Sequence, residues 1–287
     1  MTRSPSSSTS PSRPGRREGS RSCGCPLSKT GSKPTCARSA AAIDRETRLL
    51  TITGPGGIGK TRLSLELARA AAASFADGVV FVPLEHARDA VTAAAALCER
   101  LELKPVNDPA AALREHLRER RLLLVLDNFE QLVSAAPFLA SLLSAAAGLK
   151  LLVTSRTTLH LGGEREFALS SLPVPDASVP RTPDVLIRIA SVALFVQRCQ
   201  AVKRDFSLTQ ENAAAVAEIC TTLEGIPLSL ELAAGRIRVL GPEAMLERLG
   251  SRLELLTDTR RDAPTRHETV RVAEAGDLAA ETLTSSL

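Results

Sequence analysis

Aromatic residues are scarce in this chain of 287 residues: they make up 2% of it, and there is no tryptophan and no tyrosine. So few aromatic rings argue against modules that bind nucleic acids by stacking bases on aromatic side chains. The hydrophobic residues, 44% of the chain, must therefore form a core from leucine, valine, isoleucine and alanine. Such a composition favours helices packed on buried parallel strands.

The sequence also lacks an apolar run long enough to span a membrane, and it has no hydrophobic signal core near its start. Three of its cysteines, Cys98, Cys199 and Cys220, lie in apolar, helix-like stretches and are interpreted as small buried hydrophobic residues. Cys23 and Cys25 are followed by no second pair or histidine at a zinc-site spacing, so no metal site is expected there. These features favour a protein of the reducing cytoplasm.

Excess positive charge is missing from most of the chain. The net charge is +4, but residues 1–40 alone carry +7 and the remainder carries −3. The body therefore gives no electrostatic reason to expect direct nucleic-acid binding by this chain. Residues 1–40, rich in Ser, Arg and Pro, are interpreted as a disordered tail, in preference to an organellar transit peptide, because they contain no convincing amphipathic helix.

From Arg48 onward, short apolar runs alternate with helix-like segments, a pattern typical of a parallel sheet covered by helices on both faces. After a proline-rich segment, no further strand is expected. Strands are predicted at 49–53, 78–83, 122–126 and 149–154, with a short fifth at 166–169. Helices are predicted at 61–73, 90–103, 130–147, 185–202, 210–223, 227–240 and 242–249.

One motif in the first half of the chain indicates which ligand this half binds. Residues Gly54-Pro55-Gly56-Gly57-Ile58-Gly59-Lys60-Thr61 match the phosphate-binding loop pattern, and the motif lies between a predicted strand and a predicted helix. The glycines let backbone N–H groups approach phosphates, and the helix N-terminus adds its positive dipole end. We expect Lys60 to reach the β- and γ-phosphates of ATP and Thr61 to ligate Mg²⁺. A glycine-rich turn with a solvent-exposed lysine is the alternative that this context disfavours.

Such a loop needs a carboxylate at the end of a neighbouring strand to hold the metal, and Asp127 directly follows the third strand. An Asp at that place could also simply begin a turn. Asn128 stands where many hydrolytic relatives have a second acid, which predicts slow turnover. Glu130 is then the nearby candidate base, although it could equally be an acid of the first helical turn. Arg156, after the fourth strand, could sense the γ-phosphate or could be a solvated arginine.

Four segments follow one another along the chain in this order: TITGPGGIGKTRLSLELA, LLLVLDNFEQL, LLVTSR and EGIPLSLELAA. Together they resemble the STAND class of P-loop ATPases, in particular the NB-ARC-like nucleotide-binding module of large actinobacterial transcriptional regulators. The resemblance implies that Gly54–Thr61 is Walker A, Asp127 the Walker B metal ligand and Arg156 the sensor arginine. It also implies that Pro227 belongs to a GxP motif and lies against the adenine. Arg62, next to Walker A, is counted among the nucleotide-binding residues.

Two departures from that family stand out. The Gly-Arg-Glu-type motif expected before the first strand has no match around residues 40–48, and the pattern is lost where a winged helix should begin. A fragment, or a reading frame altered at both ends, is therefore expected. The predicted organisation is a tail at 1–40, a P-loop NTPase domain with a parallel sheet at 41–172, a linker at 173–183, a small helical domain at 184–257, and an unassigned segment at 258–287.

The predicted function is an ATP/ADP-binding molecular switch with slow hydrolysis, part of a signalling or transcriptional regulator. Its expected ligands are ATP or ADP with Mg²⁺, and a protein partner or self-association is expected, with no membrane partner. A turnover ATPase or kinase is the alternative, although no substrate lid or acceptor site is recognised in the sequence. A degenerate fragment that binds nucleotide weakly is the third interpretation.

Overall fold

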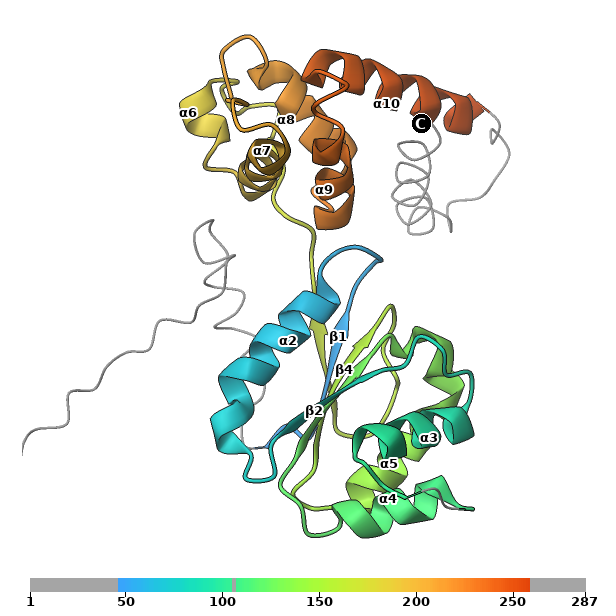
Figure 1. The fold of residues 1–287 in the computed structure, drawn as a ribbon. Coiled ribbons are helices and arrows are strands. Elements are labelled where there is room, and N and C mark those ends of the chain that lie inside the picture. The colour runs from blue at the N-terminus through green and yellow to red at the C-terminus, as the bar shows by residue number, and fades with distance from the viewer. Residues whose placement is uncertain (1–45, 105–106, 259–287) are drawn as a thin grey trace, which may run out of the picture.

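The computed structural model describes residues 46–104 and 107–258, with the main chain alone for 251–258. Its centre is a five-stranded sheet in the order β2-β3-β4-β1-β5, and every neighbouring pair is parallel (Figure 1). This arrangement confirms the predicted α/β class with a parallel sheet. The strands are β1 (Leu49–Thr53), β2 (Val79–Pro83), β3 (Leu123–Asp127), β4 (Lys150–Ser155) and β5 (Glu164–Ala168).

Apolar side chains alternate between the two faces of the sheet. Leu50, Ile52 and Leu152 join one buried cluster, which includes Leu63 and Leu67 of helix α2 (Lys60–Ala71). Leu49 and Leu151 point the opposite way, into a larger cluster beneath the other helices. A sheet covered on both faces needs unbroken apolar strands, which explains the runs seen in β1, β3 and β4. Those helices are α3 (Ala90–Arg100), α4 (Pro109–Leu117) and α5 (Ala136–Ala145), preceded by the 3₁₀ segment η3 (Phe129–Ala135).

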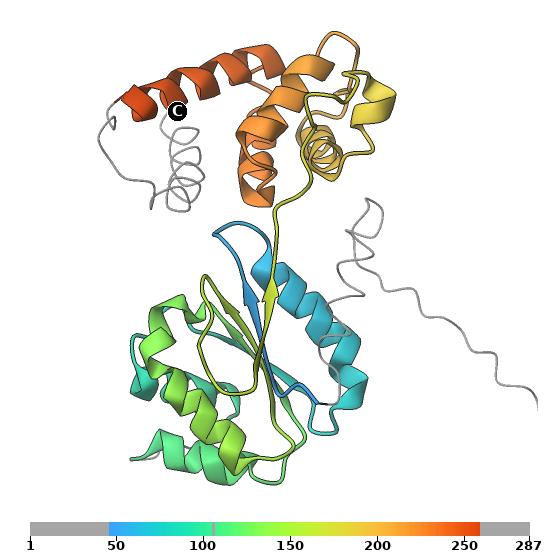
Figure 2. The ribbon, with the colours of Figure 1, turned by 180° about the vertical axis from the view of Figure 1, so that it is seen from behind.

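The edge strand β5 differs from the others because its side chains are half-buried or exposed. Its sequence, EREFA, places charges on an edge that could otherwise pair with another chain. Residue Leu169, just beyond it, donates a hydrogen bond of 2.8 Å to the carbonyl oxygen of Thr53. The chain then leaves the sheet and runs to the helical part (Figure 2). This exit begins directly beside the end of β1.

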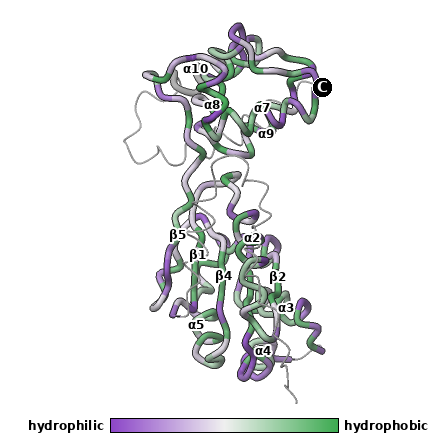
Figure 3. Tube along the Cα trace, turned by 90° about the vertical axis from the view of Figure 1, so that its left-hand side faces the viewer, coloured by the Kyte–Doolittle hydropathy of each residue, from purple (hydrophilic) through white to green (hydrophobic). Residues whose placement is uncertain are grey.

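In the second part, residues 183–258, every described element is a helix, and this part has a buried cluster of its own. Phe195, Cys199 and Cys220 are among its fully buried residues. Figure 3 shows apolar segments within both parts. The helices are α6 (Pro183–Leu186), α7 (Ala190–Val202), α8 (Ala213–Thr222), α9 (Pro227–Gly235) and α10 (Pro242–Asp258), with the short η2 (Ala72–Ser74) in the first part.

Several predicted details need correction. The single helix expected at 185–202 is two helices, since α6 ends at Leu186 and α7 begins at Ala190. Helix α10 runs on to Asp258, beyond the predicted 249. Helix α4 had no prediction, although Asp108 caps it by accepting a hydrogen bond of 3.0 Å from the Ala111 amide.

The interpretation of cysteines as small buried residues is confirmed for the three that lie in the described residues. Cys98, Cys199 and Cys220 are free and buried, and burial raises the pKa of the thiols of Cys199 and Cys220 to about 12. Cys23 and Cys25, like the predicted tail at 1–40 and the segment from 259, lie outside the described residues. Within the ranges that the structure describes, no helix is long and apolar enough to cross a membrane.

Candidate nucleotide-binding site

The loop between β1 and α2 holds the predicted phosphate-binding motif. Three of its glycines have backbone angles that other residues rarely adopt: φ is +147° at Gly54, +71° at Gly57 and +101° at Gly59. Gly59 is the N-cap of α2, so the first amides of that helix face the loop. The loop therefore provides what a phosphate needs, namely close backbone approach and the positive end of a helix. Ile58 is buried beneath it.

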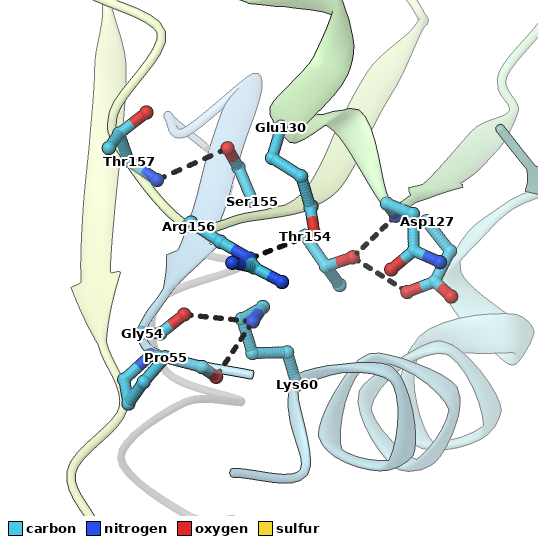
Figure 4. A network of polar contacts seen from close by, with 10 residues as sticks. Gly54, Pro55, Lys60, Asp127, Glu130, Thr154, Ser155, Arg156 and Thr157 are labelled. Atoms are coloured by element: carbon cyan, nitrogen blue, oxygen red, sulfur yellow. Dashed lines mark hydrogen bonds and ion pairs between the residues drawn. The ribbon is translucent and has the colours of Figure 1, made fainter. Parts of the chain in front are cut away.

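Lys60, the first residue of α2, folds back over this loop. Its Nζ donates hydrogen bonds of 2.8 Å to the carbonyl oxygen of Gly54 and 3.0 Å to that of Pro55 (Figure 4). Burial lowers the pKa of Lys60 below its ordinary value of 10.5. Glu130 and Asp127 act to raise it, while Arg156 lowers it further. All three groups thus lie near enough to Lys60 to influence its charge.

Thr61 and Asp127 meet although they are far apart in the chain. The Thr61 hydroxyl lies 2.8 Å from Oδ1 and 3.0 Å from Oδ2 of Asp127. Asp127 ends β3 and is buried, whereas Thr61 lies in the first turn of α2. A hydroxyl and a carboxylate are the hard oxygen ligands that Mg²⁺ takes when phosphates supply further oxygens. The donor set fits the predicted metal.

Thr154 of β4 is a polar residue of the site that the motif comparison did not single out. Its hydroxyl donates to Asp127 Oδ1 at 2.6 Å and accepts from the backbone N–H of Asn128 at 3.0 Å. Asn128 has left-handed backbone angles, φ 62° and ψ 51°, which Asn tolerates better than most residues. The sequence offered one signal for Thr154: it lies in LLVTSR, at the end of the predicted strand that follows the strand of Asp127.

Glu130 and Arg156 form an ion pair on the phosphate side of the sheet. Nε of Arg156 is 3.5 Å from Oε1 of Glu130, and Figure 4 shows the two side chains converging above Lys60. The other oxygen, Oε2, is buried and has no hydrogen-bond partner among the described residues. The guanidinium also lies near Gly56, since a Cβ built there would be 3.7 Å from its terminal nitrogen. The strand-end arginine thus faces the loop.

The predicted GxP segment reaches the same loop from the helical part. The amide of Leu228 donates a hydrogen bond of 3.1 Å to the carbonyl oxygen of Gly57. A Cβ built on Gly57 would lie only 2.8 Å from Leu228 Cβ. Pro227 is the first residue of α9 and is half-buried. Gly225 packs so closely on Leu172 that a Cβ there would be 2.1 Å from the Leu172 carbonyl oxygen.

Most of the predicted site residues therefore meet at one end of the sheet. Lys60, Thr61, Asp127, Glu130 and Arg156 surround the loop, and α9 adjoins it at Gly57. Arg62 lies half-exposed on α2 and, among the described residues, shares no hydrogen bond or ion pair with them. The roles assigned to all these residues stay predictions.

Comparison with known proteins supports the fold of the first part of the chain. A family model described as an AAA domain matches residues 43–167. The chain resembles Cdc6p from Pyrobaculum aerophilum in structure, with a TM-score of 0.54, 14% identity, and coverage of 96% of this chain and 83% of that one. At that identity the likeness shows the fold alone. The parallel sheet and this likeness show a P-loop NTPase fold, followed by a helical part.

Some of the sequence relatives are regulators by name. The chain is 35% identical over 235 residues to Rv0890c of Mycobacterium tuberculosis, named as an HTH-type transcriptional regulator; the match covers 81% of this chain. It is 27% identical over 218 residues to the regulatory protein AfsR of Streptomyces coelicolor, which covers 71% of this chain. The chain spans 25% of the length of the first relative and 19% of the second.

Proposed function

We propose that this chain is the nucleotide-binding module of a signalling or transcriptional regulator, and that it acts as an ATP/ADP switch with slow hydrolysis. One observation carries the proposal: the phosphate-binding loop is hydrogen-bonded directly to the helical part, from Leu228 N–H to Gly57 carbonyl. A ligand that alters the loop must therefore alter, or be altered by, the position of α9. A switch requires such differential contact between its two states.

Nucleotide binding would divide among the loop residues. The amides of Gly56 to Gly59 and the N-terminus of α2 would hold the phosphates. Lys60 would exchange its two carbonyl partners, Gly54 and Pro55, for the β- and γ-phosphates. Mg²⁺, when bound, would neutralise charge on the phosphates. Thr61 and Asp127 are the residues that would hold it.

Hydrolysis would depend on Glu130 and Arg156. Asn128 cannot take a proton from water, so Glu130 is the candidate base, and its Oε2, which has no hydrogen-bond partner among the described residues, would need to open to an attacking water. Arg156 would contact the γ-phosphate and hold Glu130 at the same time. A single arginine that serves both groups would link loss of the γ-phosphate to release of Glu130.

The helical part would follow the nucleotide through two adjacent contacts. One is the Leu228 hydrogen bond to the loop, and the other is the hydrogen bond of 3.0 Å from the Leu172 amide to the Gly225 carbonyl. Pro227 lies between them and is proposed to pack against the adenine. The domain boundaries proposed from the sequence, with a linker at 173–183, make Leu172 the last residue of the nucleotide-binding domain.

The setting proposed for the switch comes from the names of the relatives. In a longer regulator, the module would act through a protein partner or through self-association in the cytoplasm. Direct contact with nucleic acid would fall to other parts of such a protein, because the body of this chain is mildly acidic.

The nucleotide content of the purified chain tests the proposal. We expect bound ADP after purification, tight binding of ADP in calorimetry, and ATP turnover well below about 10 per second, the median for enzymes. An empty site combined with rapid turnover would instead favour the ATPase or kinase alternative. Failure to bind either nucleotide, with the protein folded, would favour the degenerate fragment.

A further inference from the structure

We infer that Thr154 is a positioning residue that selects which oxygen of Asp127 is presented to Mg²⁺. The inference rests on the proposed function, because it concerns the metal of the same site. Thr154 would not touch the metal or the nucleotide itself. It would act through the carboxylate of Asp127, whose rotation it fixes.

The sheet places Thr154 beside Asp127. Leu126 pairs with Val153 in the β3–β4 register, so the next residues along the two strands are neighbours. Thr154 is fully buried, and its hydroxyl donates to Oδ1 of Asp127 at 2.6 Å. A short bond from a hydroxyl to a carboxylate is among the stronger hydrogen bonds in proteins.

The hydroxyl of Thr154 has little freedom to form a different hydrogen bond. It has one proton to donate, and its oxygen already accepts the N–H of Asn128 at 3.0 Å. The Asn128 amide therefore holds the Thr154 oxygen in place and leaves its proton directed at Asp127. The same contact ties the left-handed turn at Asn128, which leads to Glu130, to the metal-binding carboxylate.

The two oxygens of Asp127 consequently differ. Oδ1 accepts from Thr154 at 2.6 Å and lies 2.8 Å from the Thr61 hydroxyl, whereas Oδ2 has Thr61, at 3.0 Å, as its one partner within the described ranges. Oδ2 is thus the oxygen with more unused acceptor capacity. Partners of this kind orient metal ligands, and their loss typically lowers metal affinity about 10- to 100-fold.

A control variant separates the positioning role of Thr154 from a purely structural role of a buried threonine. The same sheet contains a second fully buried threonine, Thr51 of β1, whose hydroxyl has no hydrogen-bond partner among the described residues. Thr51 shows that a central strand accommodates a threonine without using its hydroxyl. It is also the matched control, because Thr51→Val makes the same change in a buried strand away from Asp127.

The test compares Thr154→Val, Thr154→Ser and Thr51→Val in the whole chain. Calorimetry would give the affinity for ATP and ADP with Mg²⁺ and with EDTA, and thermal melting without nucleotide would give stability. For Thr154→Val we expect the Mg²⁺-dependent gain in ATP affinity to fall at least about tenfold, while ADP binding in EDTA stays near that of the parent. Thr154→Ser should restore the gain, and Thr51→Val should leave it unchanged.

The inference is overturned if Thr154→Val keeps the parent's full Mg²⁺-dependent gain, or if it weakens binding equally with and without Mg²⁺. Thr154→Ala removes the same hydroxyl without adding a γ-carbon and takes its place if the valine variant does not fold. A parent protein that binds no nucleotide, or binds it without any effect of Mg²⁺, contradicts the proposed function instead. The two failures are thereby told apart.

Discussion

Arg156 and Glu130 share one ion pair in which only one carboxylate oxygen takes part. Nε of the arginine lies 3.5 Å from Oε1 of the glutamate, while Oε2 is buried without a hydrogen-bond partner in the described part of the chain. A buried carboxylate oxygen left without a partner costs free energy, so opening this pair would let Oε2 gain a hydrogen bond to water. The pair is therefore the place to test whether this site hydrolyses ATP.

Replacing Glu130 with Gln should slow hydrolysis while leaving nucleotide affinity nearly unchanged. The change keeps the shape of the side chain and removes its basicity, and a positioned base typically contributes about 10²–10⁴-fold. Phosphate release in a single turnover measures the effect. Equal rates for the variant and the parent would assign Glu130 to the helix start alone, and a parent that turns over tens of ATP per second would contradict the switch.

Replacing Lys60 with Ala should weaken ATP binding at least about tenfold at neutral pH. Hydrogen bonds to charged groups contribute about 1.5–3 kcal/mol, and about 1.4 kcal/mol corresponds to a factor of ten. Unchanged affinity in a calorimetric titration would refute the assignment of the phosphate loop.

The affinity difference between the parent and Lys60→Ala should also shrink as the pH rises. Burial lowers the pKa of Lys60, so its protonated, phosphate-binding form is lost from the free protein at a pH below 10.5. Above that lowered pKa, ATP affinity should fall in the parent and stay level in the alanine variant. Titrations at a series of alkaline pH values would measure this, and parallel curves would show that the lysine charge is not what binds.

Replacing Asp127 with Ala should abolish the tightening of ATP binding by Mg²⁺ and leave ADP binding in EDTA mostly intact. The reason is that, in the proposed site, the Asp127 carboxylate ligates the metal and does not contact the phosphates. Calorimetry with Mg²⁺ and with EDTA separates the two. Equal loss under both conditions would make Asp127 a structural residue, held between Thr61 and Thr154.

Replacing Leu228 with Ala should speed ADP release about fivefold. The side chain is 47% exposed and packs on Gly57, so its truncation forfeits about 1 kcal/mol of the contact between α9 and the loop. Val239→Ala is the control, since Val239 is apolar, lies in the same helical part and is 82% exposed. Release of a fluorescent ADP analogue measures both, and equal rates for the two variants would argue against coupling through Leu228.

Local patterns allowed the strands and the phosphate loop to be predicted from the sequence. The first strand, 49–53, matches β1 in both bounds, because a continuous apolar run and a glycine turn define it. The break between Leu186 and Ala190 was missed because the apolar pattern continues across it. Helix α4 was missed although Asp108 and Pro109 are ordinary helix-start residues.

The contacts that the sequence could not provide are those between segments distant along the chain. Thr154 finds Asp127 only because β3 and β4 are neighbours in the sheet. Leu228 finds Gly57 only because the chain leaves β5 next to β1 and returns as α9. Motif order predicted which residues belong to the site, but hydrogen-bond partners depend on strand order and on the path of the chain between strands.

The position of β1 between β4 and β5 determines when, during synthesis of the chain, this strand can pair on both sides. Leu49 pairs with Leu151 on one side and Glu164 on the other, so the strand that carries the phosphate loop gains its first neighbour after about 100 further residues and its second slightly later. At about 5–20 residues per second, that delay is about 5–20 s. During it, the apolar segment Leu49–Thr53 has neither of the strands that flank it in the finished sheet.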